Sequence, residues 1–210
     1  MSRESRENVI ILIGAGGHAR ACIDVIEQEA RFKVGGLVAP ESDGFWTFGK
    51  YIRLGDDAAL PHLLNTGDYP NALVAIGQIK TPEARIRTFE YLRTRCILPV
   101  IVSPRAYVSP HAKLGAGTIV MHGAIVNAGA VVGDNCILNT NSLVEHDAVI
   151  GDHCHISTHA TVNGGATVGN GTFIGSNASV RQGQRIGAYC VIGLGKSVVK
   201  DSADGATVAK

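Results

Sequence analysis

The sequence of 210 residues predicts two parts: a small α/β domain with a parallel sheet, followed by a coil of stacked short strands. Three observations predict this fold class. Val, Ile or Leu recurs at every sixth residue from Val102 to Val198. Strand-like and helix-like segments alternate before that repeat, and glycines follow the first strand-like run. A period of six fits neither a helix face nor a half-buried strand, so a strand and a turn must repeat together.

The N-terminal part alternates expected strands with expected helices. Strands are expected at 9–13, 34–38 and 71–76. A helical pattern runs from the glycines to about residue 30, and a charged amphipathic helix is expected at 82–95. This alternation predicts a parallel sheet. Because the segment after residue 97 leads into the repeat, we expect one domain over 1–97 and a second over 98–210.

The turn Gly14–His18 follows the first expected strand and opens the first helix. Its glycines present bare backbone N–H groups at a helix N-terminus, which suits an anion. With Ala19, the spacing also fits a dinucleotide fingerprint. However, the second strand ends in Val38-Ala39-Pro40 without the expected acidic residue, and the domain is half a dinucleotide fold. A phosphate or nucleotide-sugar pocket is therefore favoured over NAD, and a tight turn without a ligand is the alternative.

The repeat predicts a coil with three sides. Two residues before each aliphatic, from Ala106 onward, the residue is small except at Gln184 and Lys196. The two positions face the same side of a strand, so large and small side chains fill a narrow interior. Aliphatic–glycine pairs recur every eighteen residues: Leu114-Gly115, Val132-Gly133, Ile150-Gly151, Val168-Gly169 and Ile186-Gly187. Each coil therefore takes three hexapeptides, and the units stack as in other repeat proteins.

Composition excludes several classes of protein. The net charge of +1 gives no strong field toward nucleic acid or an anionic membrane. No apolar run approaches the ~20 residues that cross a bilayer, and the polar N-terminus does not resemble a signal peptide. The five cysteines form no CxxC pair, and their odd number argues against a disulfide framework, so a cytoplasmic location is expected. Three of them, Cys136, Cys154 and Cys190, fall on the small interior position and are expected to be buried filler.

Two segments together resemble a known family. One is the turn after the first strand, Ile13-Gly-Ala-Gly-Gly-His18, and the other is Asn139–Asp147 followed by Gly151–Ser157. The chain resembles the bacterial nucleotide-sugar N-acetyltransferases and the related sialic acid O-acetyltransferases, the PglD/NeuD-like hexapeptide-repeat transferases. The resemblance implies a Rossmann-like N-terminal unit followed by a left-handed parallel β-helix. It also implies a homotrimer with acetyl-CoA as co-substrate and no metal.

The same resemblance assigns the site residues. It implies that His146 is the general base and that Asp147 raises its basicity. It places four positions along the acetyl-CoA: His155, Gly164, Ser176 and Leu194. It places four positions around the nucleotide sugar: Gly16, Gly17, His18 and Gly77.

The residues themselves suit acetyl transfer. A thioester is already activated, so the reaction needs a base that deprotonates the acceptor, and histidine, with a pKa near ~6.5, fills that role at neutral pH. A carboxylate beside it, Asp147 or Glu145, would stabilise the imidazolium. Gly164 lies eighteen residues after His146, hence one coil away, and is a candidate oxyanion donor. His155 precedes the interior Ile156, so its side chain is expected to point outward.

Three alternative functions remain open from the sequence. Ala39-Pro40 replaces an acidic pair that related UDP-sugar enzymes carry, so the nucleotide stays open, and O-acetylation of a sialic acid-like sugar is the closest alternative reaction. A β-helix metal hydratase would use a histidine cluster, here His146, His153, His155 and His159, but no two of these have the five-residue spacing of such enzymes. The last alternative is a non-catalytic scaffold. The C-terminal Ala206–Lys210 also differs from the family's Gly-x-Pro-Ala-Lys-like segment.

Overall fold

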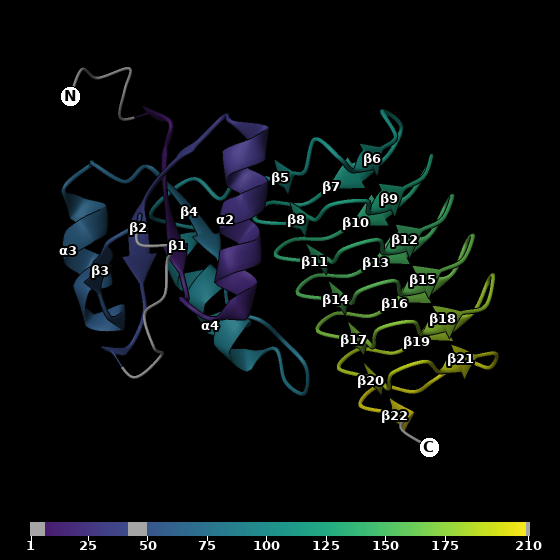
Figure 1. The fold of residues 1–210 in the computed structure, drawn as a ribbon. Helices are drawn as coiled ribbons and strands as arrows, with labels where there is room; N and C mark the ends of the chain where they lie inside the picture. The colour runs from purple at the N-terminus through teal and green to yellow at the C-terminus, as the bar shows by residue number, and fades with distance from the viewer. Residues whose placement is uncertain (1–6, 42–49, 209–210) are drawn as a thin grey trace.

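The computed structural model describes residues 7–41 and 50–208, and it contains a four-stranded parallel sheet followed by a coil (Figure 1). The sheet has the order β3-β2-β1-β4, and its pairs are all parallel, as predicted. Its strands are β1 (Val9–Ile13), β2 (Lys33–Val38), β3 (Arg53–Gly55) and β4 (Asn71–Val74). The sequence predicts three of these four, and the three-residue β3 carries too short a pattern to be detected.

Helices cover both faces of this sheet. They are α2 (Gly17–Glu29), η2 (Asp57–Ala59), α3 (Leu60–Asn65) and α4 (Glu83–Leu92). Alternate residues of β1 face opposite sides: Ile10 and Leu12 pack with α2, whereas Ile11 and Ile13 pack with α3 and α4. The predicted helix at 82–95 is shorter by several residues, because Pro82 is its N-cap and the last turn ends at Leu92.

The coil consists of two-residue strands in three parallel sheets. The seven-stranded sheet contains β5 (Ile101–Val102), β8 (Ile119–Val120), β11 (Ile137–Leu138), β14 (His155–Ile156), β17 (Phe173–Ile174), β20 (Val191–Ile192) and β22 (Thr207–Val208). The six-stranded sheet contains β6 (Tyr107–Val108), β9 (Ile125–Val126), β12 (Leu143–Val144), β15 (Thr161–Val162), β18 (Ser179–Val180) and β21 (Ser197–Val198). The five-stranded sheet contains β7 (Lys113–Leu114), β10 (Val131–Val132), β13 (Val149–Ile150), β16 (Thr167–Val168) and β19 (Arg185–Ile186).

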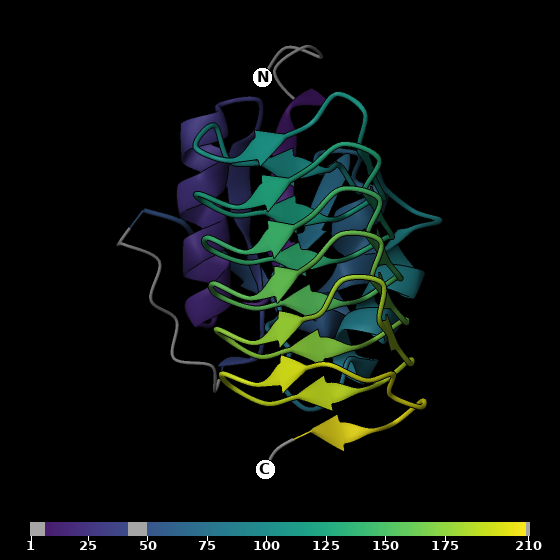
Figure 2. The same ribbon diagram turned by 90° about the vertical axis from the view of Figure 1, so that its right-hand side faces the viewer.

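The register confirms the predicted coil length. Partners in neighbouring strands are eighteen residues apart, as for Ile119 and Ile137, and the rungs stack evenly in Figure 2. The last pair is shorter, since Val191 pairs with Thr207. The predicted large and small positions form the interior of the coil, and Cys136, Cys154 and Cys190 are buried there as expected.

The turns of the coil repeat a positive backbone φ with the same period of six. Backbone φ is positive at every sixth residue from Gly117 to Gly195, usually at glycine or asparagine, which tolerate that conformation. The glycine of each aliphatic–glycine pair has another role. A methyl group on Gly133 would lie 2.8 Å from the backbone N of Asp152 in the next coil. Only glycine therefore allows the corners to stack so closely.

The two parts share a core, and this sets the position of the site. The outward residues Ile101, Ile119 and Ile137 of the seven-stranded sheet are buried with the apolar residues of α2. Helix α2 accordingly stands between the N-terminal sheet and the coil (Figure 1). Within the described ranges, no helix has the length and apolar character required to cross a membrane.

Candidate active site

The first candidate region is the His146 corner, formed by turns 145–148 and 163–166 between the six-stranded and five-stranded sheets. His146 is exposed, and its Nδ1 lies 2.9 Å from Oδ2 of Asp147. The carboxylate of Glu145 instead accepts the backbone N–H of His146 at 3.0 Å. The hydrogen bond that His146 donates to the Asp147 carboxylate raises the pKa of His146. This geometry orients the imidazole with Nε2 directed away from the carboxylate, as proton abstraction requires.

Gly164 lies directly against the His146 imidazole. A methyl group on Gly164 would approach Nε2 of His146 to 2.6 Å, and the N–H of Gly165 donates to the backbone oxygen of His146 at 3.0 Å. The structure thus brings His146, Asp147 and Gly164 together at the one-coil spacing that the sequence predicts. Their catalytic roles remain predictions.

The second region is the glycine cleft, an open cleft of about 440 Å³ where the N-terminal domain meets the coil. Its lining comes from α2, from the loop after β4 and from the seven-stranded sheet: Gly17, His18, Ala21, Gly77, Gln78, Ile79, Asn139 and His155. Gly16 is the N-cap of α2 and lies at the start of the same helix. The residues predicted to hold the nucleotide sugar therefore meet at one helix N-terminus, which suits an anionic group.

His155 belongs to this cleft. Its side chain points away from the coil interior, as predicted, but the N-terminal domain covers it and leaves it 7% exposed. Nδ1 donates to the backbone oxygen of Gln78 at 2.7 Å, and Nε2 accepts from the amide of Asn139 at 3.1 Å. Burial lowers the pKa of His155 to about 4, so the imidazole is neutral and its tautomer is fixed. A contact with acetyl-CoA at this residue remains a prediction.

His18 is the second imidazole of the cleft. Its Nε2 lies 3.5 Å from Sγ of Cys22, one turn along α2. Burial, with the nearby charge of Arg85, lowers the pKa of His18 to about 3. Burial also raises the pKa of Cys22 to about 12, so the thiol stays protonated and donates to His18. Both imidazoles of the cleft are thus uncharged at neutral pH.

The other two predicted coenzyme positions lie elsewhere. Ser176 follows β17 and Leu194 follows β20, so both lie on the corner between the seven-stranded and six-stranded sheets. Leu194 is 71% exposed, and Oγ of Ser176 lies 2.9 Å from Oγ of Ser157. Within one chain, this corner differs from the corner of Gly164, whereas Ser176 contacts the residue two positions after His155.

The four histidines considered as a metal cluster are spread over the coil. His146, His153 and His159 occupy three different corners, and His155 lies on the seven-stranded sheet. In the ranges 7–41 and 50–208, no three His, Cys, Asp or Glu side chains converge as metal ligands would.

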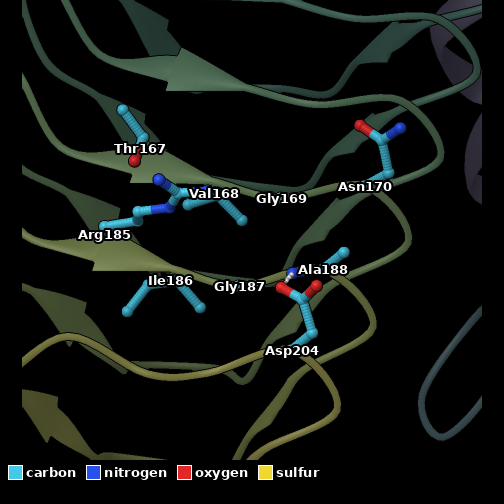
Figure 3. A pocket seen from close by; sticks show the side chains of 9 residues that line it. All are labelled: Thr167, Val168, Gly169, Asn170, Arg185, Ile186, Gly187, Ala188 and Asp204. Carbon is cyan, nitrogen blue, oxygen red and sulfur yellow. Dashed lines mark hydrogen bonds between the residues drawn. The ribbon is translucent and has the colours of Figure 1, made fainter.

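A further hollow of about 450 Å³ lies over the last strands of the five-stranded sheet (Figure 3). Its polar groups mostly hold the coil together: Oδ1 of Asn170 accepts the N–H of Asp152 at 3.0 Å, and Oδ1 of Asp204 accepts that of Ala188 at 2.8 Å. Arg185 extends across the sheet beside Thr167. No predicted site residue lines this hollow.

Three polar residues of the cleft region are absent from the sites that the sequence predicts. Asn139 lies within the motif that carried the resemblance, yet nothing in its position indicated a partner for His155. Gln78 directly follows Gly77, and that adjacency is the one signal that could have found it. Arg85 looks like one more charged residue of an amphipathic helix, but the structure buries it beside the cleft.

A coil of hexapeptide repeats with an exposed histidine–carboxylate pair, joined to an α/β domain with a glycine cleft, defines a hexapeptide-repeat acyltransferase. Residues 9–92 match the PglD N-terminal domain, and residues 129–164 match the bacterial transferase hexapeptide family. The chain belongs to the PglD family of acetyltransferases.

Solved structures agree with this assignment. A perosamine N-acetyltransferase from Caulobacter crescentus, solved with CoA and GDP-perosamine, is 33% identical over 94% of this chain and 91% of its own, with a TM-score of 0.87. The acetyltransferase domain of PglB from Neisseria gonorrhoeae, in complex with acetyl coenzyme A, is 30% identical over 97% of this chain and 96% of its own, with a TM-score of 0.87. A comparison with curated protein sequences gives no significant match.

Proposed function

We propose that the protein transfers the acetyl group of acetyl-CoA to the amino group of a nucleotide-linked amino sugar, with His146 as the general base. The observation that carries the proposal is the His146–Asp147 pair held against the backbone of Gly164. The C. crescentus relative, solved with CoA and GDP-perosamine, supports the substrate class. The five free thiols suit a cytoplasmic reaction.

In the proposed mechanism, the sugar amine binds as an ammonium ion and loses a proton to Nε2 of His146. Asp147 stabilises the imidazolium that forms. The amine then attacks the thioester carbonyl, and the proposed oxyanion donor is the backbone N–H of Gly164. When the intermediate collapses, the carbon–sulfur bond breaks, and the CoA sulfur receives the second proton that the attacking nitrogen loses. The imidazolium of His146 releases the first proton to solvent. The products are the acetamido sugar and the thiol of CoA.

This mechanism requires a neighbouring subunit. The His146 corner lies between the six-stranded and five-stranded sheets, so in a three-sided coil it is opposite the seven-stranded sheet that carries the glycine cleft. We propose a homotrimer in which the cleft of one subunit faces the His146 corner of the next. Outward aliphatic residues on the two uncovered sheets support this arrangement: Ile125, Val131 and Val149 are about two-fifths exposed.

Mixed oligomers test the shared site. His146→Ala and a variant that blocks the cleft, Gly17→Trp, would each be inactive alone. Co-assembled, they should regain part of the activity, because one subunit keeps an intact corner and its neighbour keeps an intact cleft. If the mixture stays inactive although mixed oligomers form, the shared site is wrong.

Substrate class is tested by release of CoA thiol from acetyl-CoA in the presence of a panel of sugar nucleotides. We expect turnover with amino-sugar nucleotides and none with the matched hydroxyl sugars. Turnover with hydroxyl or sialic acid-like acceptors instead would favour the O-acetyltransferase alternative. The absence of acetyl-CoA binding would favour a scaffold.

A further inference from the structure

Arg85 carries a buried positive charge between the two parts of the chain. It lies on α4 and is 1% exposed. Nη1 donates to the backbone oxygens of Val74 at 3.1 Å and Ile76 at 2.6 Å. Nη2 donates to the backbone oxygen of Asn135 at 2.7 Å and to its Oδ1 at 2.8 Å. The guanidinium therefore joins the end of β4 directly to a turn of the coil.

This cation has no partner of opposite charge among the described residues. Its four acceptors are carbonyl and amide oxygens, and its Nε has no hydrogen-bond partner. Burying a charge without a counter-ion costs stability, and a neutral side chain of similar size is often as stable or more so. Packing alone therefore does not explain why a cation occupies this position.

The loop that Arg85 holds leads into the glycine cleft. Arg85 binds Ile76, and the next two residues, Gly77 and Gln78, line the cleft. The amide of Gln78 donates to the backbone oxygen of Gly171 at 3.0 Å, and His155 donates to the backbone oxygen of Gln78. The loop is thus fixed to the coil on one side and to Arg85 on the other.

We propose that Arg85 is a positioning residue for the acceptor site: its guanidinium fixes the Gly77–Gln78 loop against the coil and thereby sets the orientation and tautomer of His155. The chain of contacts runs from Arg85 through the loop to His155 and then to Asn139. The use of this cleft by the acceptor rests on the proposed function, whereas the positioning of His155 is a property of the protein alone.

The charge of Arg85 also acts on the imidazoles of the cleft. The groups that face His155 are His18 with Cys22 from α2, Arg85 from α4, and the neutral Asn139 and Phe173 of the coil. Burial is the main cause of the low pKa values of His155 and His18. The hydrogen bond to Gln78 raises the pKa of His155, and the Arg85 charge lowers both pKa values. Removing the guanidinium should loosen the loop and raise both pKa values.

Nuclear magnetic resonance of the imidazole nitrogens in the full-length protein tests this inference without a ligand. In the wild type, His155 should remain the Nδ1–H tautomer down to about pH 4. In Arg85→Met, it should titrate at higher pH and lose the single tautomer. Arg85→Lys keeps the charge but loses the forked guanidinium that binds the loop and Asn135 at the same time. In this variant His155 should show mixed tautomers with a smaller rise in pKa. An unchanged His155 in a folded Arg85→Met variant would overturn the proposal.

Two further variants guard against misfolding and nonspecific effects. Asn135 has a φ of 53°, so Asn135→Gly keeps the turn and removes one acceptor of the fork, and a smaller change at His155 is expected. Arg87→Met removes an exposed arginine from the same helix and should leave His155 unchanged. A response of His155 to Arg87→Met equal to that of Arg85→Met would also contradict the proposal.

Kinetics supply the functional readout. With the acceptor found in the sugar-nucleotide panel, Arg85→Met should lower kcat/KM by roughly tenfold to a hundredfold, the usual scale for a displaced binding group. Because the loop lines the acceptor cleft and His155 is the predicted acetyl-CoA contact, the change should appear in the KM of the acceptor and, to a smaller extent, in that of acetyl-CoA. If no acceptor is found, the proposed function fails while the resonance experiment still decides the role of Arg85. If KM for both substrates is unchanged, the positioning role fails.

Discussion

The His146 corner and the glycine cleft hold histidine side chains in opposite environments. His146 is exposed and bonded to a carboxylate, which raises its pKa. His155 is buried and bonded to a backbone carbonyl and an amide, and burial lowers its pKa to about 4. The first environment favours proton uptake and the second prevents it. His146 is therefore suited to proton transfer, whereas His155 is suited to holding a fixed hydrogen-bond geometry. The two residues are only nine positions apart in the sequence.

The largest expected effect is at the corner. His146→Ala should lower kcat by about 10² to 10⁴, the range for loss of a general base, and change the KM values little. Thiol release measures it. His111→Ala, an exposed histidine on the same corner two coils earlier, is the matched control and should keep full turnover. If His146→Ala turned over as fast as the control, His146 would not be the general base.

Protonation at acid pH should cost more folding stability at the glycine cleft than at the His146 corner. The unfolded chain binds protons at histidine near ~6.5, whereas folded His155 does so only near pH 4. The unfolding free energy should therefore fall as pH drops from about 6.5 to about 4, by on the order of 3 kcal/mol for His155 alone. Denaturant titrations at several pH values measure it. His155→Gln should flatten this dependence, while an equal flattening in His146→Gln would contradict the assignment.

Gly164→Ala tests whether close packing of Gly164 against the His146 imidazole is needed for activity. The added methyl group would meet the imidazole of His146 at 2.6 Å from Nε2, so the ring must move. We expect roughly a hundredfold lower kcat, because displacements of about 1 Å have that effect. Gly183→Asn, one coil past Gly165 and with open space around it, should retain activity. A crystal structure of Gly164→Ala with an unmoved ring would refute the explanation.

Asp147→Asn should give a smaller loss, about tenfold in kcat, since the imidazolium loses a charged partner. Asn tolerates the φ of 59° at this position, so the turn should persist. Because Asp147 raises the pKa of His146, the acid limb of the rate profile should move to lower pH in the variant. A pH–kcat profile measures this shift, and an unmoved acid limb would point to Glu145 as the partner.

The smallest effect is expected inside the coil. Cys136→Ala leaves a small residue at a small interior position and should cost about 1 kcal/mol of unfolding free energy, with unchanged turnover. Thermal unfolding and thiol release measure the two quantities. A loss of activity without a loss of stability would show that the interior cysteines do more than fill space.

Prediction from sequence works where the period fixes geometry. The eighteen-residue coil implies that Gly164 lies against His146, and no tertiary information is needed for that. It also implies that His155 points outward. The period cannot reveal that the N-terminal domain covers the face of the coil that carries His155, because the docking of the two parts depends on the shapes of both α2 and the coil. The same limit hides Arg85, since a charged residue in an amphipathic helix gives no sign of burial, and it hides the pairing of Asn139 with His155.

The length of helix α2 matches a fixed number of strand spacings along the coil. Its 13 residues rise about 1.5 Å each, close to four strand spacings of about 4.8 Å. Its first turn, at His18, meets the coil at His155. Farther along, Asp24 pairs with His122 at 2.7 Å, two coils earlier, and the last turn reaches β5. Removing one helical turn would therefore move the cleft by about one rung. Helix length and rung number must change together if the cleft is to stay level with the proposed base of a neighbouring subunit.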